Sequence, residues 1–223
     1  MAMSSDSAIR SATTEEPTTQ RGRSTRRALM DAAREVISRV GYAEARVVDI
    51  TTEAGKSVGV FYNYFTDKSE LLRTMVDEFR DKAYTRGDTV ETGDREPYDV
   101  IRDVTAVYWT TYREHAPVLS GVFQAAQIDP TFVEYWRDLR APARTMIAKN
   151  IRRLQARGYC PGMDPGITAS AIGAMLDYFC YVWLVEGGEV GRSSVTDQEA
   201  IDTLSRIWFN ALWWKPEGAH DPT

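Results

Sequence analysis

The sequence predicts an all-α protein of about nine helices, and three observations support this fold class. Apolar residues recur every three to four positions along most of the chain. Capping residues, glycine or proline bound the segments that show this spacing. No convincing strand pattern or internal repeat interrupts them. The 223 residues, 43% of them hydrophobic, suffice for a core in one or two domains.

The first predicted helix covers residues 24–41, and its apolar residues form a single stripe. Ser24 can act as its N-cap, and Gly41 follows its last turn. A shorter second helix begins after a turn and ends at Gly55. The boundaries of both helices therefore follow from local chemistry.

A short third helix contains the stretch VGVFYNYF, residues 58–65, in which aromatic residues alternate with small and polar ones. Such a helix can bury one face and offer the other to a partner. Asp67 and Glu70 stand three residues apart and form a capping box for a fourth helix. This helix is predicted to run to about Thr85, where a charged loop follows.

Residues 97–115 and 116–127 are predicted to form a fifth and a sixth helix. The seventh begins at Asp129-Pro130, where a capping side chain precedes a proline at the first helical position. Its apolar stripe continues to Gly158. These segments are long enough to form the body of a second domain.

The last two predicted helices are apolar on more than one face. Asp164-Pro165 introduces the eighth helix, and a capping box of Thr196 and Glu199 introduces the ninth. A soluble chain must bury such surface, which indicates contact with another subunit. We therefore expect a homodimer. Its interface is predicted to contain Trp208 and Leu212.

Composition excludes several classes of protein. No apolar run approaches the roughly 20 residues of a membrane span, and the polar start of the chain lacks a signal-peptide pattern. Cys160 and Cys180 are too few for a disulfide framework. His115 and His220 lie far apart without nearby cysteine, so no zinc-site spacing is visible. With no nucleotide-binding or hydrolase motif either, we expect a cytoplasmic protein that is not an enzyme and has no metal, cofactor or membrane partner.

Charge is unevenly distributed along the chain, whose formal net charge is −5. Residues 21–72 carry nine Lys and Arg against seven Asp and Glu, whereas residues 73–223 carry seventeen against twenty-two. The stretch RGRSTRR, residues 21–27, has four arginines and no acid. A basic end on an acidic body fits a local contact with phosphate. On charge alone, a solvated tail is the simpler interpretation.

The second and third predicted helices, joined by Gly55-Lys56-Ser57, have the form of a helix-turn-helix. In that motif the second helix enters the major groove of DNA with its first residues at base edges. Its surface would offer hydroxyl, amide and ammonium groups and a glycine that permits close approach, on Ser57, Gly59, Tyr62, Asn63 and Lys68. Periodicity alone fits a small three-helix bundle with aromatic packing equally well.

Four patterns follow one another between residues 24 and 72: R-x-x-L-x-x-A-A, a G-Y turn, V-x-D-I-x-x-E-A-G and S-x-G-x-F-Y-x-Y-F-x-x-K-x-x-L-L. Their most informative positions are Arg26, Gly41-Tyr42, Asp49, Gly55, Ser57, Gly59, Phe61, Tyr62, Tyr64, Phe65 and Lys68. This stretch resembles the amino-terminal domain of TetR-family transcriptional regulators. About fifty residues with this many matches form a specific signal, which favours the DNA-binding interpretation.

The resemblance implies a role for each matched position. Phe61 and Phe65 are expected to pack inside the small domain. Tyr62 and Tyr64 are expected to contact phosphates or bases, and Lys68 a phosphate at a helix start. The resemblance also implies a carboxy-terminal helical domain that binds a ligand and dimerises.

Five positions depart from the family pattern, namely Arg46, Val48, Lys56, Val58 and Val60. Valines on the recognition helix can contact thymine methyl groups instead of hydrogen-bonding a base, and Lys56 can supply the displaced charge. The operator sequence therefore stays open. The predicted DNA-contacting residues are Arg26, Arg46, Lys56, Ser57, Val58, Gly59, Val60, Tyr62, Asn63, Tyr64 and Lys68.

Aromatic residues are concentrated in the predicted helices five to eight. Ordinary core packing explains any one of them, but as a group they predict a pocket for a mostly apolar effector with few polar anchors. The predicted ligand-contacting residues are Trp109, Tyr112, Phe123, Trp136 and Tyr178. Asp177 lies in an apolar helix, where an unpaired carboxylate is costly to bury. It can face a ligand or pair with another group, and its role stays open.

Taken together, the sequence predicts a disordered polar arm (1–22), a helix-turn-helix DNA-binding domain (23–66), a ligand-binding and dimerisation domain (67–217) and a short tail (218–223). The predicted function is a transcriptional repressor that a small hydrophobic effector releases from a palindromic operator. A helical small-molecule-binding protein or enzyme without a DNA role is the alternative. The sequence does not separate a repressor from an activator.

Overall fold

The computed structural model describes residues 17–87 and 95–216, and within helix α4 the side chains up to Asp81. Its regular structure in these ranges is helical, which confirms the predicted all-α class. The chain divides into two compact units, Met1–Asp77 and Glu78–Thr223. The predicted arm lies outside the described residues up to position 16, as does the predicted tail 218–223 with His220.

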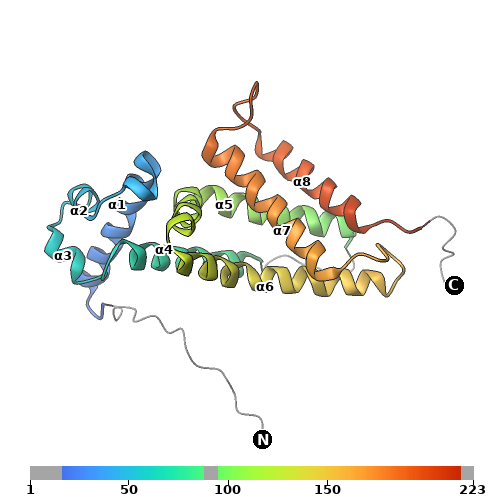
Figure 1. Ribbon diagram of the computed structural model, residues 1–223, viewed down its shortest axis with the longest axis horizontal. Coiled ribbons are helices and arrows are strands. Elements are labelled where there is room, and N and C mark those ends of the chain that lie inside the picture. The colour runs from blue at the N-terminus through green and yellow to red at the C-terminus, as the bar shows by residue number, and fades with distance from the viewer. Residues whose placement is uncertain (1–16, 88–94, 217–223) are drawn as a thin grey trace, which may run out of the picture. The chain divides into compact units, whose positions relative to one another are not determined.

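The first unit contains α1 (Gln20–Glu44), α2 (Val47–Glu53), α3 (Val58–Tyr62) and the start of α4 (Lys68–Gly87) (Figure 1). Helix α1 begins four residues earlier than predicted because Thr19, not Ser24, caps it and accepts a hydrogen bond from the Gly22 backbone N–H at 3.1 Å. Gly41 has φ 77° and ψ 163°, so the regular helix ends there, as its sequence position predicts.

The second unit contains α5 (Pro97–Ile128), α6 (Pro130–Gln155), α7 (Pro165–Tyr181), a π-helical turn η1 (Val182–Glu186) and α8 (Asp197–Leu212). Helix α5 packs against α8, α6 packs against α7, and α5 also contacts both α6 and α7 (Figure 1). The core of this unit therefore lies between two pairs of helices.

The predicted fifth and sixth helices are one continuous helix, so the described residues contain eight α-helices instead of about nine. Pro117 lies inside α5 and removes one backbone N–H, but the helix passes through it. Burial of apolar residues on both sides of Pro117, among them Tyr112, Val118 and Val122, favours continuation.

The three predicted helix caps of the second unit are confirmed. Asp129 and Asp164 accept hydrogen bonds from the backbone N–H groups of Thr131 (2.9 Å) and Ile167 (2.8 Å). At α8, Thr196 and Glu199 form the predicted reciprocal capping box. The hydrogen bonds from the Thr196 backbone and from Arg192 hold the pKa of Glu199 low, at about 2. Local sequence signals thus set where these helices begin.

The segment Pro165–Glu186 corrects one expectation, because it is long and apolar enough to cross a membrane by length and composition. A buried helix of a soluble protein passes the same test, so the observation is weak evidence for a membrane span. Here α7 packs against α6 within the second unit.

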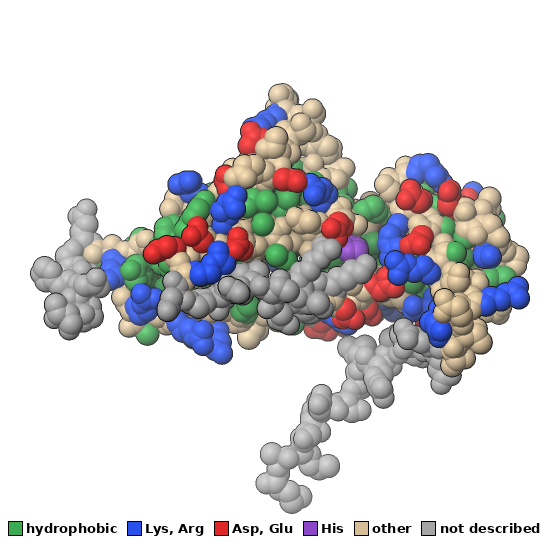
Figure 2. Space-filling model, turned by 180° about the vertical axis from the view of Figure 1, so that it is seen from behind, with side chains coloured by type: hydrophobic (Ala, Val, Ile, Leu, Met, Phe, Trp, Pro, Cys, Tyr) green, Lys and Arg blue, Asp and Glu red, His purple; other side chains and the backbone are tan. Residues whose placement is uncertain are grey.

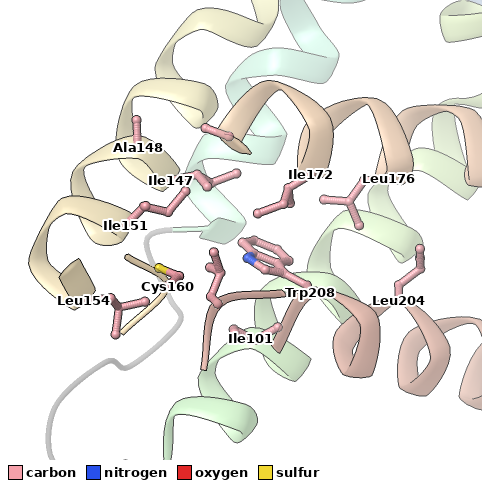
Figure 3. Packing of buried hydrophobic residues seen from close by; sticks show 12 residues of the cluster. Ile101, Ile147, Ala148, Ile151, Leu154, Cys160, Ile172, Leu176, Leu204 and Trp208 are labelled. Atoms are coloured by element: carbon pink, nitrogen blue, oxygen red, sulfur yellow. The ribbon is translucent and has the colours of Figure 1, made fainter. Parts of the chain in front are cut away.

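Trp208 and Leu212 lie inside the core of the protomer rather than on its surface. Trp208 is 7% exposed, and its ring lies among side chains of α5, α6 and α7, including Ile101 and Ile172 (Figure 3). Leu212 is buried in the same cluster. The sequence prediction placed both in a dimer interface because α8 is apolar on more than one side, but the protomer itself covers this side. The exposed stripe of α8 contains Thr203, Ile207 and Asn210.

We predict that Trp208→Ala lowers the free energy of unfolding by about 3–5 kcal/mol, because it leaves a cavity in the core. Ile128→Ala, at an exposed position at the end of α5, should change it by less than about 1 kcal/mol. Denaturant unfolding of both variants measures the difference. Equal losses would contradict the placement of Trp208 inside the protomer.

Candidate DNA-binding and ligand-binding sites

The turn between α2 and α3 has the geometry of a helix-turn-helix. Gly55 has φ 62°, which an L side chain rarely adopts, and the next backbone N–H, of Lys56, donates to the Thr51 carbonyl at 2.8 Å. Ser57 then serves as the N-cap residue of α3. Because α2 and α3 contact each other, this turn fixes which face of α3 turns outward.

Helix α3 and the turn that follows it each bury one phenylalanine, and α3 exposes its other face. Phe61 and Phe65 are fully buried in the first unit, as predicted, with their ring centroids 5.5 Å apart. Tyr62 is 56% exposed and Val58 39% exposed. The other predicted contact residues on and beside α3 are exposed or half-buried, namely Lys56, Ser57, Gly59, Val60, Asn63 and Tyr64. The structure therefore brings this part of the predicted set together on one short segment.

The outward face of α3 carries no charged side chain, because Val58–Tyr62 reads VGVFY. A Cβ atom added at Gly59 would meet nothing closer than Ser57 Oγ at 3.9 Å, so a partner molecule can approach the backbone closely there. Elsewhere, acidic and basic side chains are interspersed over the face shown in Figure 2. The outward face of α3 is therefore distinguished by its shape and apolar character, not by carrying charges of one sign.

Arg46 and Asp49 form a pair at the start of α2. Arg46 donates to the Asp49 carboxylate through Nε and Nη2, each at 2.8 Å, and both side chains face solvent. These hydrogen bonds lower the pKa of Asp49. Arg46 takes the place of a hydroxyl cap, and Asp49 instead accepts its backbone N–H at 3.3 Å. Arg26, another predicted DNA-contacting residue, lies over the Phe65 ring at 5.4 Å from its centroid.

Lys68 makes contacts that the sequence did not reveal. Its ammonium group donates to the carbonyl oxygens of Tyr42 (2.7 Å), Ala43 (3.2 Å) and Ala45 (2.8 Å) and lies 4.3 Å from the centroid of the Tyr42 ring. Partial burial lowers the pKa of Lys68. An ammonium group has three hydrogens, so the carbonyls at the end of α1 use all of them. In this structure Lys68 joins the start of α4 to the end of α1 instead of offering a free donor to phosphate.

Comparison with known proteins identifies this site. Residues 29–75, which include α2, α3 and the Lys68 junction, match the family of bacterial regulatory proteins described as the tetR family. The chain is 24% identical over 188 residues to the transcriptional regulator EthR of Mycolicibacterium smegmatis, and the match covers 83% of this chain and 85% of EthR. This chain therefore carries the DNA-binding domain of the TetR family. It is a DNA-binding transcriptional regulator with a helix-turn-helix.

Solved structures of TetR regulators share the fold of most of this chain. A TetR-family regulatory protein from Rhodococcus RHA1 has a TM-score of 0.70 at 16% identity and covers 87% of this chain and 98% of its own. The ketosteroid transcriptional regulator KstR2 of Mycobacterium tuberculosis has a TM-score of 0.64 at 17% identity, covering 89% and 98%. At these identities the likeness shows the fold alone.

The five predicted ligand-contacting residues lie in three different environments. Trp109 and Tyr112 are fully buried on α5. Phe123 packs on Trp136 with ring centroids 4.9 Å apart. Tyr178 is 62% exposed on α7. Tyr181, which the prediction omitted, connects two of these places, with its ring centroid 5.3 Å from Phe123 and 6.2 Å from Tyr178.

Trp109 is tied to the start of α8. Its indole N–H donates to Asp197 Oδ1 at 2.8 Å, and Arg113 pairs with the same carboxylate. These hydrogen bonds lower the pKa of Asp197. Trp109 therefore already has a polar partner, and its ring centroid lies 6.0 Å from that of Phe179.

Asp177 is a buried, paired acid, and two residues that sequence analysis missed are its partners. The Tyr108 hydroxyl donates to Oδ1, and Arg140 Nε lies 2.7 Å from Oδ2. Burial raises the pKa of Asp177, while the hydrogen bond from Tyr108 and the charge of Arg140 oppose this rise. Arg140 is on α6 and Asp177 on α7, so no local spacing signals the pair.

Two open hollows lie on the second unit, and neither is lined by a predicted ligand-contacting residue. The larger, of about 440 Å³, lies between the η1 region and α8, beside Phe179, Trp183 and Arg192. The smaller is on α8 around Ile207. The ligand assignment thus stays a proposal.

We predict that Lys68→Met lowers the free energy of unfolding by about 2 kcal/mol, because three carbonyl oxygens lose a charged donor. Lys56→Met is the matched control, since Lys56 is exposed in the same unit. It should leave stability unchanged within about 0.5 kcal/mol. Thermal and denaturant unfolding compare the two, and equal stability would contradict the structural role of Lys68.

Proposed function

We propose that this TetR regulator is a cytoplasmic, homodimeric repressor that binds a palindromic operator and is released by a small, mostly apolar effector. The observation that carries the DNA-binding part is the outward face of α3, which is exposed, uncharged and held by the buried Phe61 and Phe65. A helix of this kind can enter the major groove without burying an unpaired charge.

The proposed base contacts come from α3. Val58 can pack on thymine methyl groups, and Tyr62 offers a hydroxyl and a ring. Gly59 allows the backbone to approach the groove. Lys56, Ser57, Asn63 and Tyr64 flank these residues and are proposed to contact phosphates or base edges, as is exposed Arg46. Lys68 is proposed to act on DNA indirectly, by holding α4 against the end of α1.

Dimerisation is proposed to use the exposed stripes of α7 and α8. Ile167 and Tyr178 are exposed on α7, and Ile207 is 51% exposed on α8. Trp214 follows α8 and is also exposed. A second copy of the chain would cover these side chains and place two α3 helices on one duplex. Successive major grooves on one side of B-DNA lie ~34–36 Å apart.

Effector binding is proposed to occur in the second unit, among the aromatic residues of α5, α6 and α7. Trp136 and Phe123 pack together there, and Tyr112 is buried on α5, the helix that also carries Phe123. An effector that binds one arrangement of the two α3 helices better than another would shift the population away from the DNA-bound arrangement.

We predict that Tyr62→Ala weakens binding to a selected duplex by about 1–3 kcal/mol, because it removes a contact from the groove-facing side of α3. The duplex would first be selected from a randomised library with the wild-type protein. Tyr62→Phe separates the hydroxyl from the ring, and Val190→Ala, in a fully exposed loop of the second unit, is the control. Wild-type affinity of Tyr62→Ala would contradict the proposed docking.

We predict that Ile207→Glu raises the dimer dissociation constant at least about tenfold, because the new charge would be buried between two copies. Ile128→Glu, at an exposed site at the end of α5, should leave the dimer intact. Analytical ultracentrifugation measures both, and circular dichroism checks that helicity is retained. A wild-type monomer at micromolar concentration would overturn the proposed assembly.

A further inference from the structure

A polar cluster, buried at Tyr112 and Asp177 and partly exposed at Tyr108 and Arg140, joins helices α5, α6 and α7 in the second unit. It consists of Tyr108 and Tyr112 on α5, Arg140 on α6 and Asp177 on α7. Tyr108 and Tyr112 are one helical turn apart, with ring centroids separated by 6.1 Å. Asp177 is bonded to Tyr108 and paired with Arg140, so all three helices meet at one carboxylate.

Two polar atoms of this cluster lack a hydrogen-bond partner among the described residues. One is the hydroxyl of Tyr112, a residue that is 1% exposed. The other is Asp177 Oδ2, which lies close to Arg140 Nε but is not aligned with it for a hydrogen bond. Folded proteins rarely leave such groups unpaired, and each costs free energy when buried. The cluster therefore presents one unused hydroxyl, on Tyr112, and one carboxylate oxygen of Asp177 that is ion-paired with Arg140 but accepts no aligned hydrogen bond.

Aromatic rings adjoin the polar cluster. The Arg140 guanidinium lies 5.9 Å from the Trp136 ring centroid, Trp136 packs on Phe123, and Phe123 packs on Tyr181. Burial raises the pKa of both Tyr108 and Tyr112, so these hydroxyls stay neutral at ordinary pH. Apart from the Asp177–Arg140 ion pair itself, these neighbouring groups are therefore aromatic rings and neutral hydroxyls.

Charge balance decides the kind of polar group that fits. Arg140 already compensates the charge of Asp177. A carboxylate would bring a second anion next to Asp177, and an ammonium group would compete with Arg140 as a second cation; both are costly in a poorly hydrated site. A hydroxyl adds no charge, can donate to Asp177 Oδ2 and can accept from Tyr112.

We propose that Tyr112 and Asp177 form the polar anchor of the effector site and that this site takes a neutral hydroxyl compound, an alcohol or phenol with an apolar body. The apolar body would lie against Phe123, Trp136 and Tyr181. This inference rests on the proposed function in taking the site to be that of the effector. Arg140 and Tyr108 hold the Asp177 carboxylate in place for the ligand.

The test uses three probes with the same chain and different head groups: octanol, octylamine and octanoate. Calorimetry on the full-length protein measures their binding at neutral pH, where the amine is cationic and the acid anionic. Octanol is expected to bind at least about tenfold more tightly than either charged probe. Tighter or equal binding of octylamine or octanoate would overturn the proposal, as would no binding of octanol.

The variant Tyr112→Phe tests whether the Tyr112 hydroxyl anchors a ligand or only supports the fold. It should weaken octanol binding about tenfold, while the Tm of the free protein stays unchanged or rises because an unpaired buried hydroxyl is removed. Tyr98→Phe, on the same helix but beside Phe209, is the matched control and should bind octanol like the wild type. A lower Tm with unchanged octanol binding would overturn the proposal and indicate a structural role, for instance through a bound water.

Binding to the selected duplex is also measured, without any probe. This measurement distinguishes failure of the proposed ligand anchor from failure of the proposed repressor function. If the protein binds duplex but octanol binding does not depend on Tyr112, the anchor is wrong and the regulator function stands. If octanol binds through Tyr112 but no duplex is bound, the ligand site stands and the proposed repressor function fails.

Discussion

The DNA-binding unit depends on the three carbonyl oxygens at the end of α1 that converge on the Lys68 ammonium group. Regular helix geometry in α1 ends at Gly41, and the turn that follows leaves backbone acceptors without helical partners. Lys68 satisfies these acceptors from the first residue of α4, and its charge also lies over the Tyr42 ring. The end of one helix and the start of another are thereby held by a single side chain.

This junction gives a physical reason for parts of the family pattern. The Gly-Tyr turn supplies the positive φ at Gly41 and the ring under the ammonium group, and the Tyr42 hydroxyl lies 3.2 Å from Ser69 Oγ on α4. Between these two ends, Phe61 and Phe65 fill the interior of the unit. Helix α3 is only five residues long and is too short to be stable alone. Its orientation therefore comes from packing, which leaves its outward residues free to vary with the operator.

The sequence predicted most of what local chemistry decides. The caps at Asp129, Asp164 and Thr196 and the glycine at Gly41 are local signals, and the structure confirms them. Contacts between residues that are far apart in the sequence could not be predicted from it. Nothing in the spacing shows that Arg140 faces Asp177. Likewise, an apolar α8 does not show which side the protomer covers, so Trp208 was assigned to the wrong surface of the helix. The sequence analysis also placed a helix boundary next to Pro117, but the helix is continuous there, because buried side chains on both sides outweigh one missing hydrogen bond.

The polar cluster on α5, α6 and α7 shows why stability and function need not favour the same residues. A phenylalanine at position 112 would fill the same space without an unpaired hydroxyl, so the tyrosine has no evident benefit for folding. Asp177 is likewise costly to bury, and Arg140 with Tyr108 offsets only part of that cost. Groups that destabilise the free protein and remain in its interior are those expected where a ligand supplies the missing partner. Because the three helices meet at Asp177, a ligand bound there would act on α5, α6 and α7 together, and α5 also packs against α8. Through this direct packing, a change at the anchor would reach α8, a helix proposed to form the dimer interface.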